Sequence, residues 1–240
     1  MTTTMMMMMK RLALLFSILV GLVAVTSAAS AAEDTHENCR EWAGAGECEK
    51  NPGFMMSGCA KSCDDVARAA LKDTKELESI SSFFDLAAND IFGESLEFKK
   101  FEGQVTVLVN VASECGYTDS HYRGLVKLWS SVRHTEQINV LAYPCDQFGH
   151  QEPGSSEEIN EFAVEEYGVE FTMMEKIDVN GPNASIVYKY LKSKAGPASI
   201  GWNFATYFVV SPDGSIDAYS GVEPMQLKDK LIGLLQTDEL

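Results

Sequence analysis

A β-branched apolar run from Val105 to Ala112 constrains the fold of this chain more than any other stretch of its sequence. A run of this kind indicates a buried strand. Apolar residues at helical spacing follow over His121–Val132, and a second apolar strand is expected over Ile138–Tyr143. A strand, a helix and a strand with short joins form a right-handed βαβ unit, so the two strands are expected to be parallel.

The later part of the chain adds helices and a hairpin to this unit. Ser155–Glu166 begins with serines and acids before an apolar face, which favours a helix start, and helices are also expected over Asn183–Lys194 and Glu223–Gln236. Two alternating runs, Phe204–Val210 and Ser215–Tyr219, flank a Pro-Asp-Gly turn and predict an antiparallel hairpin. A mixed sheet flanked by helices is the thioredoxin-like arrangement, expected here over 81–236, although this order also fits other α/β folds.

Cysteine is distributed unevenly along the chain. Four of the six cysteines fall in residues 33–66, a segment too small to bury a core without covalent cross-links. Four cysteines allow three pairings, and spacing alone does not choose among them. A zinc site is disfavoured because the gaps of eight, ten and three residues include no C-x2-C pair. Helix-forming residues over 67–80 then suggest a short helical linker.

The two ends of the chain carry targeting features. Lys10 and Arg11 precede an apolar run of 14 residues and then small residues, which is the layout of a signal peptide over 1–32. The run is too short to span a bilayer, so no stable membrane insertion is expected after cleavage. The tail 237–240, TDEL, resembles endoplasmic reticulum retention sequences. We expect residence in the lumen of the endoplasmic reticulum, or secretion if the tail is not recognised.

Net charge excludes one class of partner. The formal net charge is −16, with 35 acidic against 19 basic residues. A field of this sign repels phosphates, so nucleic acid is not an expected partner.

Cys115 is the first candidate for chemistry. It follows the expected strand and precedes the expected helix. Amide groups and the dipole at a helix N-terminus favour a thiolate, which is the nucleophilic form of the side chain. The alternative is an inert, half-buried thiol.

Three motifs resemble the glutathione peroxidase family: VLVNVASECGYT, NVLAYPCDQFGHQEP and WNFATYFVVSPDG, in the family's order. The resemblance covers Phe83 to Leu235. It implies a catalytic set of Cys115, Gln151, Trp202 and Asn203. Taken singly, the last three could be a solvated amide, a core aromatic and a turn residue. Together, their N–H groups could stabilise a thiolate and the hydroxide that leaves a peroxide.

The resemblance implies reduction of hydrogen peroxide or an organic hydroperoxide through a cysteine sulfenic acid. No cofactor or metal is expected, but an external thiol must restore the enzyme. Many thioredoxin-dependent members carry a resolving cysteine on the helix after QEP, whereas this chain has Phe162, Ala163 and Val164 there. Cys145, at the end of the second strand, is a candidate resolving thiol or a buried structural one.

Glutathione and a protein disulfide isomerase are the two candidate reductants. A TDSHYRGL stretch, the missing helical cysteine and the tail most resemble the luminal subgroup of glutathione peroxidases. This resemblance implies that oxidising equivalents pass to a protein disulfide isomerase.

The segment NCREWAGAGECEKNPGFMMSGCAKSC resembles the ShK-toxin-like (ShKT) domain. The resemblance implies disulfides Cys39–Cys59 and Cys48–Cys63. The family usually has six cysteines; here the two outermost, which pair with each other, are missing.

Two other functions are alternatives to a peroxidase. A thioredoxin-type oxidoreductase needs C-x-x-C, but Cys115 is followed by Gly116, Tyr117 and Thr118. A redox sensor whose ShKT-like module recruits partners is the second alternative, and peroxide turnover separates it from an enzyme. Asn183 lies in a glycosylation sequon that a luminal chain could use.

Overall fold

Residues 33–44 and 46–235 are described by the computed structural model of this chain. The signal peptide expected over 1–32 and the tail expected over 237–240 lie outside these residues. Within the described ranges, no helix combines the length and apolar character needed to cross a bilayer.

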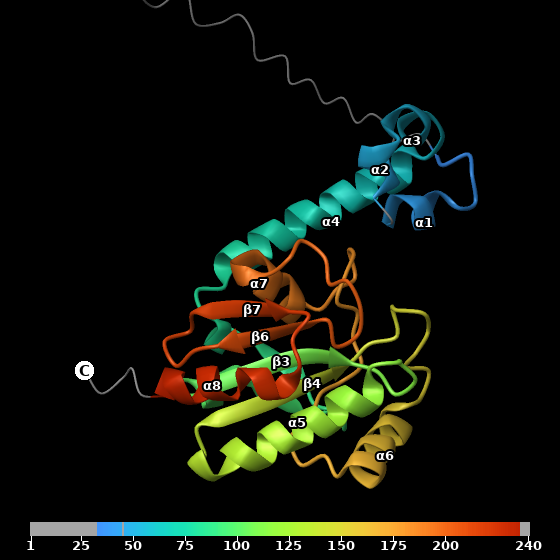
Figure 1. The fold of residues 1–240 in the computed structure, drawn as a ribbon. Helices are drawn as coiled ribbons and strands as arrows, with labels where there is room; N and C mark the ends of the chain where they lie inside the picture. Colours follow the sequence, from blue (N-terminus) through green and yellow to red (C-terminus); the bar gives the residue numbers. More distant parts are fainter. Residues whose placement is uncertain (1–32, 45, 236–240) are drawn as a thin grey trace, which may run out of the picture.

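The central sheet has the strand order β5-β4-β3-β6-β7 (Figure 1). Its strands are Thr172–Met173 (β5), Ile138–Pro144 (β4), Val105–Val111 (β3), Thr206–Val210 (β6) and Ile216–Ser220 (β7). β4 is parallel to β3 and β5, whereas β6 is antiparallel to β3 and β7. The expected parallel pair, the hairpin and the mixed, thioredoxin-like sheet are all confirmed.

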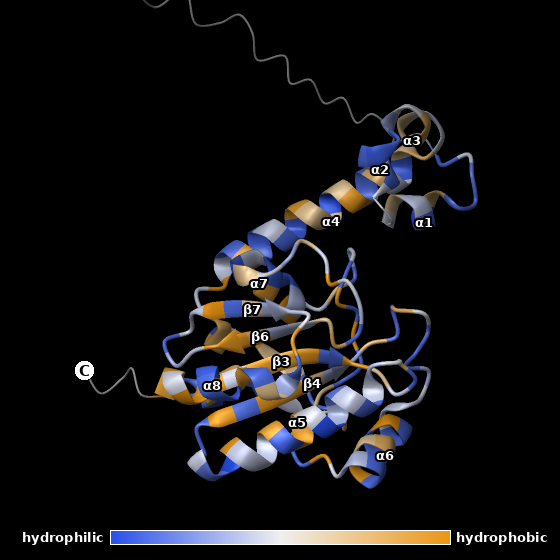
Figure 2. Cartoon of the chain, viewed as in Figure 1, coloured by the Kyte–Doolittle hydropathy of each residue, from blue (hydrophilic) through white to orange (hydrophobic). Residues whose placement is uncertain are grey.

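Helices cover both faces of this sheet, so β3 is buried along its whole length. Alternate β3 residues face opposite clusters: Val107 and Val109 lie in one, Leu108 in the other. Figure 2 shows the resulting band of hydrophobic colour through the central strands. One face is covered by α5 (Thr118–Val132), α6 (Ser156–Tyr167) and α8 (Lys228–Leu235); the other by α7 (Ile186–Ala195) and the 3₁₀ helices η1 (Phe83–Asp85) and η2 (Phe98–Phe101).

The last expected helix is two elements in the structure. A 3₁₀ helix, η4 (Pro224–Leu227), precedes α8. The backbone N–H of Glu223 donates to Gln226 Oε1 at 2.7 Å, which caps this separate turn. Pro224 packs so closely on Gly124 of α5 that a Cβ there would lie 2.9 Å from its Cγ. Contact with α5 therefore sets the direction of this turn.

Three short strands and a helix start differ from expectation. α7 begins at Ile186, not at Asn183, because Ser185 caps it by accepting the Val187 N–H. The short strands were not predicted, since each is too brief to show periodicity: β5 and a separate antiparallel pair, β1 (Ala87–Asn89) and β2 (Ser95–Glu97).

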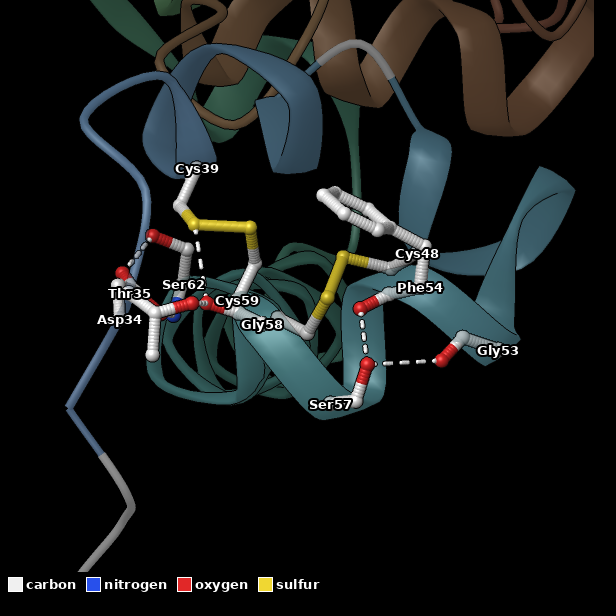
Figure 3. The surroundings of a disulfide bond; sticks show 11 residues. Asp34, Thr35, Cys39, Cys48, Gly53, Phe54, Ser57, Gly58, Cys59 and Ser62 are labelled. Carbon is white, nitrogen blue, oxygen red and sulfur yellow. Dashed lines mark hydrogen bonds between the residues drawn. A yellow bond between two sulfur atoms is a disulfide. The ribbon is translucent and has the colours of Figure 1, made fainter.

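Residues 33–66, called the cysteine module below, fold around two disulfides (Figure 3). These are Cys39–Cys59 and Cys48–Cys63, the pairs that the ShKT resemblance implies. Apart from cysteines, the buried apolar residues of the module are Ala43 and Met55. Its helices are α1 (Cys39–Gly44), α2 (Glu47–Lys50), α3 (Pro52–Gly58) and the start of α4 (Ala60–Ser79).

α4 joins the cysteine module to the rest of the chain. The helical linker expected over 67–80 thus forms the C-terminal part of one 20-residue helix, which ends at Ser79. Asp73 on α4 pairs with Lys189 on α7 at 2.7 Å, and Leu77 packs against the core cluster of that face. One continuous helix, α4, therefore begins in the module and packs on α7 at its other end (Figure 1).

Candidate active site around Cys115

Cys115 lies in the loop between β3 and α5, at the carboxyl end of β3. Its backbone N–H donates to Thr118 Oγ1 at 3.0 Å, and that hydroxyl donates to the Ala112 carbonyl at 2.7 Å. One threonine at the helix start thus holds both sides of the loop. The Cys115 side chain is 7% exposed, so solvent reaches it only narrowly.

Gln151 is presented by a tight turn that follows β4. Gly149 and His150 both have left-handed backbone angles, with φ of 68° and 52°. Glycine adopts this conformation without strain, whereas a histidine must be held there by its surroundings. The Gln151 carbonyl accepts the Glu114 N–H at 2.9 Å. This bond ties the turn to the residue directly before Cys115.

Trp202 and Asn203 lie just before β6. Asn203 is fully buried, and its Nδ2 donates to Gln151 Oε1 at 3.5 Å. Trp202 is 40% exposed, with its ring 5.6 Å from that of Phe148. Gln151 and Asn203 are therefore in direct contact. The hydrogen bond from the Glu114 N–H to the Gln151 carbonyl connects this pair to the loop that carries Cys115. Among the described residues, no hydrogen bond joins the Cys115 sulfur to these side chains.

Asn110 positions the Trp202–Asn203 segment, and the sequence analysis did not identify it. Its Nδ2 donates to Asn203 Oδ1 at 3.0 Å, and its carbonyl accepts the Phe204 N–H at 2.9 Å. Phe204 has a φ of 62°, an uncommon conformation for a bulky residue, which these contacts hold in place. The available signal was the single amide side chain in the mainly apolar run from Val105 to Ala112.

Glu152 is a second residue that the sequence analysis passed over. Its side chain is fully buried, and Ser113 Oγ donates to its Oε1 at 2.6 Å. Burial raises the pKa of Glu152 to about 7, against the opposing effects of the Ser113 hydrogen bond and Lys176. A fully buried carboxyl group is unusual in a folded protein and requires an explanation.

Cys145 lies on the opposite side of the sheet from Cys115. Cys115 packs in the cluster beneath α5, whereas Cys145 packs with Leu141 and Tyr143 in the cluster beneath α7. The Cys145 side chain is fully buried, and burial raises the pKa of its thiol to about 11. A disulfide between these two free thiols would require one of them to cross to the other face. The role of Cys145 as a resolving thiol stays a prediction.

A cavity of about 630 Å³ adjoins Trp202 and Asn203. Tyr117, His121 and Glu223 are among the residues that line it. His121 Nδ1 lies 2.6 Å from the Tyr207 hydroxyl, and burial lowers the pKa of this imidazole, against the effect of Glu223. The residues that line the cavity include no lysine or arginine.

Asn183 is exposed in the loop before α7, whereas Ala184 is buried and the Ser185 hydroxyl caps the helix. The described part of the chain holds no cluster of histidine, cysteine and acidic side chains that could bind a metal ion.

Family models match both parts of the chain. Residues 83–192 match the model described as glutathione peroxidase, and residues 32–65 match an ShK domain-like model.

Curated relatives extend this likeness. Glutathione peroxidase-like peroxiredoxin 2 of Saccharomyces cerevisiae is 42% identical over 160 residues, which cover 65% of this chain and 98% of the relative. Glutathione peroxidase 7 of Homo sapiens is 46% identical over 134 residues, covering 56% and 70%. The apo crystal structure of Trgpx is 30% identical, with a TM-score of 0.55, and covers 66% of this chain and 97% of that one.

Proposed function

This chain belongs to the glutathione peroxidase family and is a peroxide-reducing oxidoreductase, and we propose that Cys115 is its nucleophile. The observation that carries the proposal is the contact network described above. Asn203 donates to Gln151, and Gln151 accepts from the residue beside Cys115. Three segments far apart in the sequence thus meet at one end of the sheet, where the thiol lies.

The proposed step is attack of the Cys115 thiolate on one oxygen of the peroxide. The sulfur–oxygen bond forms as the oxygen–oxygen bond breaks, and the leaving oxygen takes a proton to become water or an alcohol. The sulfur is oxidised to a sulfenic acid. The roles proposed for Gln151, Trp202 and Asn203 are to donate N–H groups to the sulfur and to the leaving oxygen, where negative charge develops.

We propose that an external thiol completes the cycle. It attacks the sulfenic sulfur, releases water and forms a mixed disulfide, which a second thiol then resolves to return Cys115. The placement of Cys145 on the opposite face of the sheet supports this route over an internal disulfide. No cofactor takes part in these steps.

The endoplasmic reticulum lumen is the proposed location, with protein disulfide isomerase as the proposed reductant. The signal-like segment 1–32, the TDEL tail and the two disulfides of the cysteine module all fit an oxidising compartment. Similarity to glutathione peroxidase 7 is consistent with the luminal subgroup suggested by the sequence.

The decisive experiment is mass spectrometry after one equivalent of hydrogen peroxide, followed by addition of a thiol. We expect a sulfenic acid on Cys115 and repeated turnover with a reductant. A chain that is oxidised once and does not cycle with any thiol would instead be a redox sensor. The proposal that protein disulfide isomerase is the reductant fails if the reduced isomerase is oxidised no faster with the native chain and peroxide than with Cys115→Ser and peroxide.

A further inference from the structure

Glu152 has the only fully buried carboxyl group among the described residues. Its Oε1 accepts the Ser113 hydroxyl at 2.6 Å, but its Oε2 is buried with no hydrogen-bond partner. Burying a charged group with one unpartnered oxygen is costly to stability. A glutamine would avoid the buried charge, and a small apolar residue would avoid the unpartnered atom as well, so the presence of an acid suggests a role in the site.

The backbone of Glu152 is held as firmly as its side chain. Its N–H donates to Asp146 Oδ1 at 2.9 Å, and its carbonyl accepts Lys176 Nζ at 3.0 Å. Lys176 also donates to the Gly154 carbonyl at 2.7 Å. These contacts fix the segment after Gln151 to the loops that follow β4 and β5, so Glu152 is a rigid point of attachment.

Two adjacent contacts join this rigid segment to the Cys115 loop. One is the bond from Ser113 Oγ to Glu152 Oε1, and the other runs from the Glu114 N–H to the Gln151 carbonyl at 2.9 Å. We call this pair of contacts the 113–152 clamp. It joins the two residues before Cys115 to Gln151 and its neighbour, and therefore sets the separation of the proposed nucleophile and its proposed donor.

We propose that Glu152 is a positioning residue, whose carboxylate, through the 113–152 clamp, holds the Cys115 loop against the Gln151 turn in the reactive arrangement. This inference rests on the proposed function of Cys115 and Gln151. It assigns Glu152 no direct contact with peroxide. A small displacement of a reacting group can cost a large factor in rate, which is why a positioning residue of this kind matters.

Charge makes the clamp sensitive to pH. Burial raises the pKa of Glu152 to about 7. A hydrogen bond to a carboxylate is stronger than one to the neutral acid, so the clamp tightens as the pH rises through this value. The ionisable groups facing Glu152 are Lys176, Asp146 with its partner His150, and Tyr122 of α5, whose hydroxyl is also buried and unpartnered.

Stability changes in the opposite direction. The pKa of Glu152 in the folded chain lies above its ordinary value of 4.5, so the folded state binds the proton more tightly than the unfolded state. The associated stability is fully present below the ordinary pKa of 4.5 and is lost as the pH rises from there through the folded pKa of about 7. Glu152→Gln mimics the protonated acid in shape and charge. We therefore expect its Tm to match that of the native chain at acidic pH and to exceed it at alkaline pH.

The direct test is amide hydrogen exchange at Glu114, whose N–H belongs to the clamp. In the native chain we expect protection to rise about tenfold between acidic and alkaline pH, because the charged acceptor strengthens the clamp. Glu152→Gln should lose this rise, and Ser113→Ala should be poorly protected throughout. Ser113→Thr retains the hydroxyl and should restore protection. Glu161→Gln, an exposed acid on α6, is the matched control and should change nothing.

The kinetic test compares two reactions of the same thiol in a Cys145→Ser background. Dividing the rate of oxidation by hydrogen peroxide by the rate of alkylation by iodoacetamide cancels the thiolate fraction. We expect this ratio to fall about tenfold in Glu152→Gln and in Ser113→Ala, with no further fall in the double variant because both changes break one clamp. The inference also requires the slower Glu152→Gln protein to be the more stable one at alkaline pH.

Several outcomes would overturn the inference. Unchanged Glu114 protection in both variants would do so, as would additive losses in the double variant or a Glu152→Gln protein destabilised at every pH. Failure of the proposed function has a different signature. If the native chain does not react with peroxide, Cys115 is not a peroxidatic thiol, whereas the Glu114 protection and the Tm profile still decide the role of Glu152.

Discussion

In the cysteine module four cysteines are paired as disulfides, whereas the two cysteines of residues 81–235 are free thiols. Apart from cysteines, Ala43 and Met55 are the fully buried apolar side chains among the described residues of the module. The larger region has two extensive clusters, one on each face of a mixed sheet. Disulfides therefore take the place of a large hydrophobic core in the module. The larger region has such a core, so its cysteines are not needed as cross-links and remain thiols.

This contrast predicts that changes to cysteine will separate stability from activity. A cysteine of the module should affect folding and leave peroxide reduction intact. Substitution of Cys115 should abolish peroxide reduction and leave folding intact. The two regions meet through α4 and α7, so the separation can also be tested at their junction.

The largest effect is expected for Cys115→Ser. A hydroxyl is a far weaker nucleophile than a thiolate, so peroxide reduction should fall about a thousandfold or more. Tm should change little, because serine is nearly the same size. Stopped-flow measurement of peroxide consumption gives the rate. Cys145→Ser is the matched thiol control and should retain the native rate within about twofold; an equal loss there would mean that both thiols take part.

Removing a disulfide from the module should have the next largest effect. The double change Cys39→Ser with Cys59→Ser opens a loop of sequence separation 20 and should destabilise the module by about 2–4 kcal/mol. Hydrogen exchange over α1 and α3 should increase accordingly. Oxidation of Cys115 by peroxide should keep its native rate. A parallel loss of that rate would show that the large region depends on the module.

Asn110→Leu tests whether a buried amide can be as important to the site as a cysteine. The change removes the hydrogen bond to Asn203 and leaves that buried side chain short of a partner, at a cost of about 1–3 kcal/mol. Peroxide oxidation should slow about tenfold or more, because Trp202 and Asn203 lose their anchor.

The control for Asn110→Leu is Thr106→Val, on the same strand. The Thr106 hydroxyl is buried without a hydrogen-bond partner, so its removal should leave the rate unchanged and the stability equal or higher. A slow Thr106→Val protein would indicate that any change in β3 disturbs the site.

The smallest effect is expected at the junction of the two regions. Asp73→Asn breaks the half-buried pair with Lys189 and should weaken the packing of α4 on α7 by about 1 kcal/mol or less. Exchange of α4 amides should rise slightly, with no change in peroxide reduction. Asp64→Asn, which removes an exposed pair with Arg68 within α4, is the control. An activity change in Asp73→Asn alone would show communication between module and site.

Much of the fold followed from patterns in the sequence. The βαβ unit was predictable because Val105–Val111 and Ile138–Pro144 are buried on both faces and read as apolar runs. The hairpin was predictable from the Pro-Asp-Gly turn, where Gly214 has a φ of 85°. β5 was not predictable, because two residues cannot show a period. The division of the last helix depended on a contact between Pro224 and Gly124, which lie far apart in the chain.

The candidate site divides in the same way. Cys115, Gln151, Trp202 and Asn203 were proposed from motifs, because each lies in a stretch of sequence that resembles the glutathione peroxidase family. Asn110 and Glu152 were missed, since their contribution consists of hydrogen bonds to residues that only folding brings near.

The sequence alone determined the nature of this protein: an α/β domain of the glutathione peroxidase family with a small cross-linked module before it. Residue type and spacing suffice for that, because they set local conformation and recognisable chemistry. The tertiary structure decided which groups meet. It placed Cys115 and Cys145 on opposite faces of one sheet, although their strands are neighbours, and it buried one carboxylate beside the site. Which face a loop residue joins, and how deeply an acid is buried, depend on packing across the whole domain.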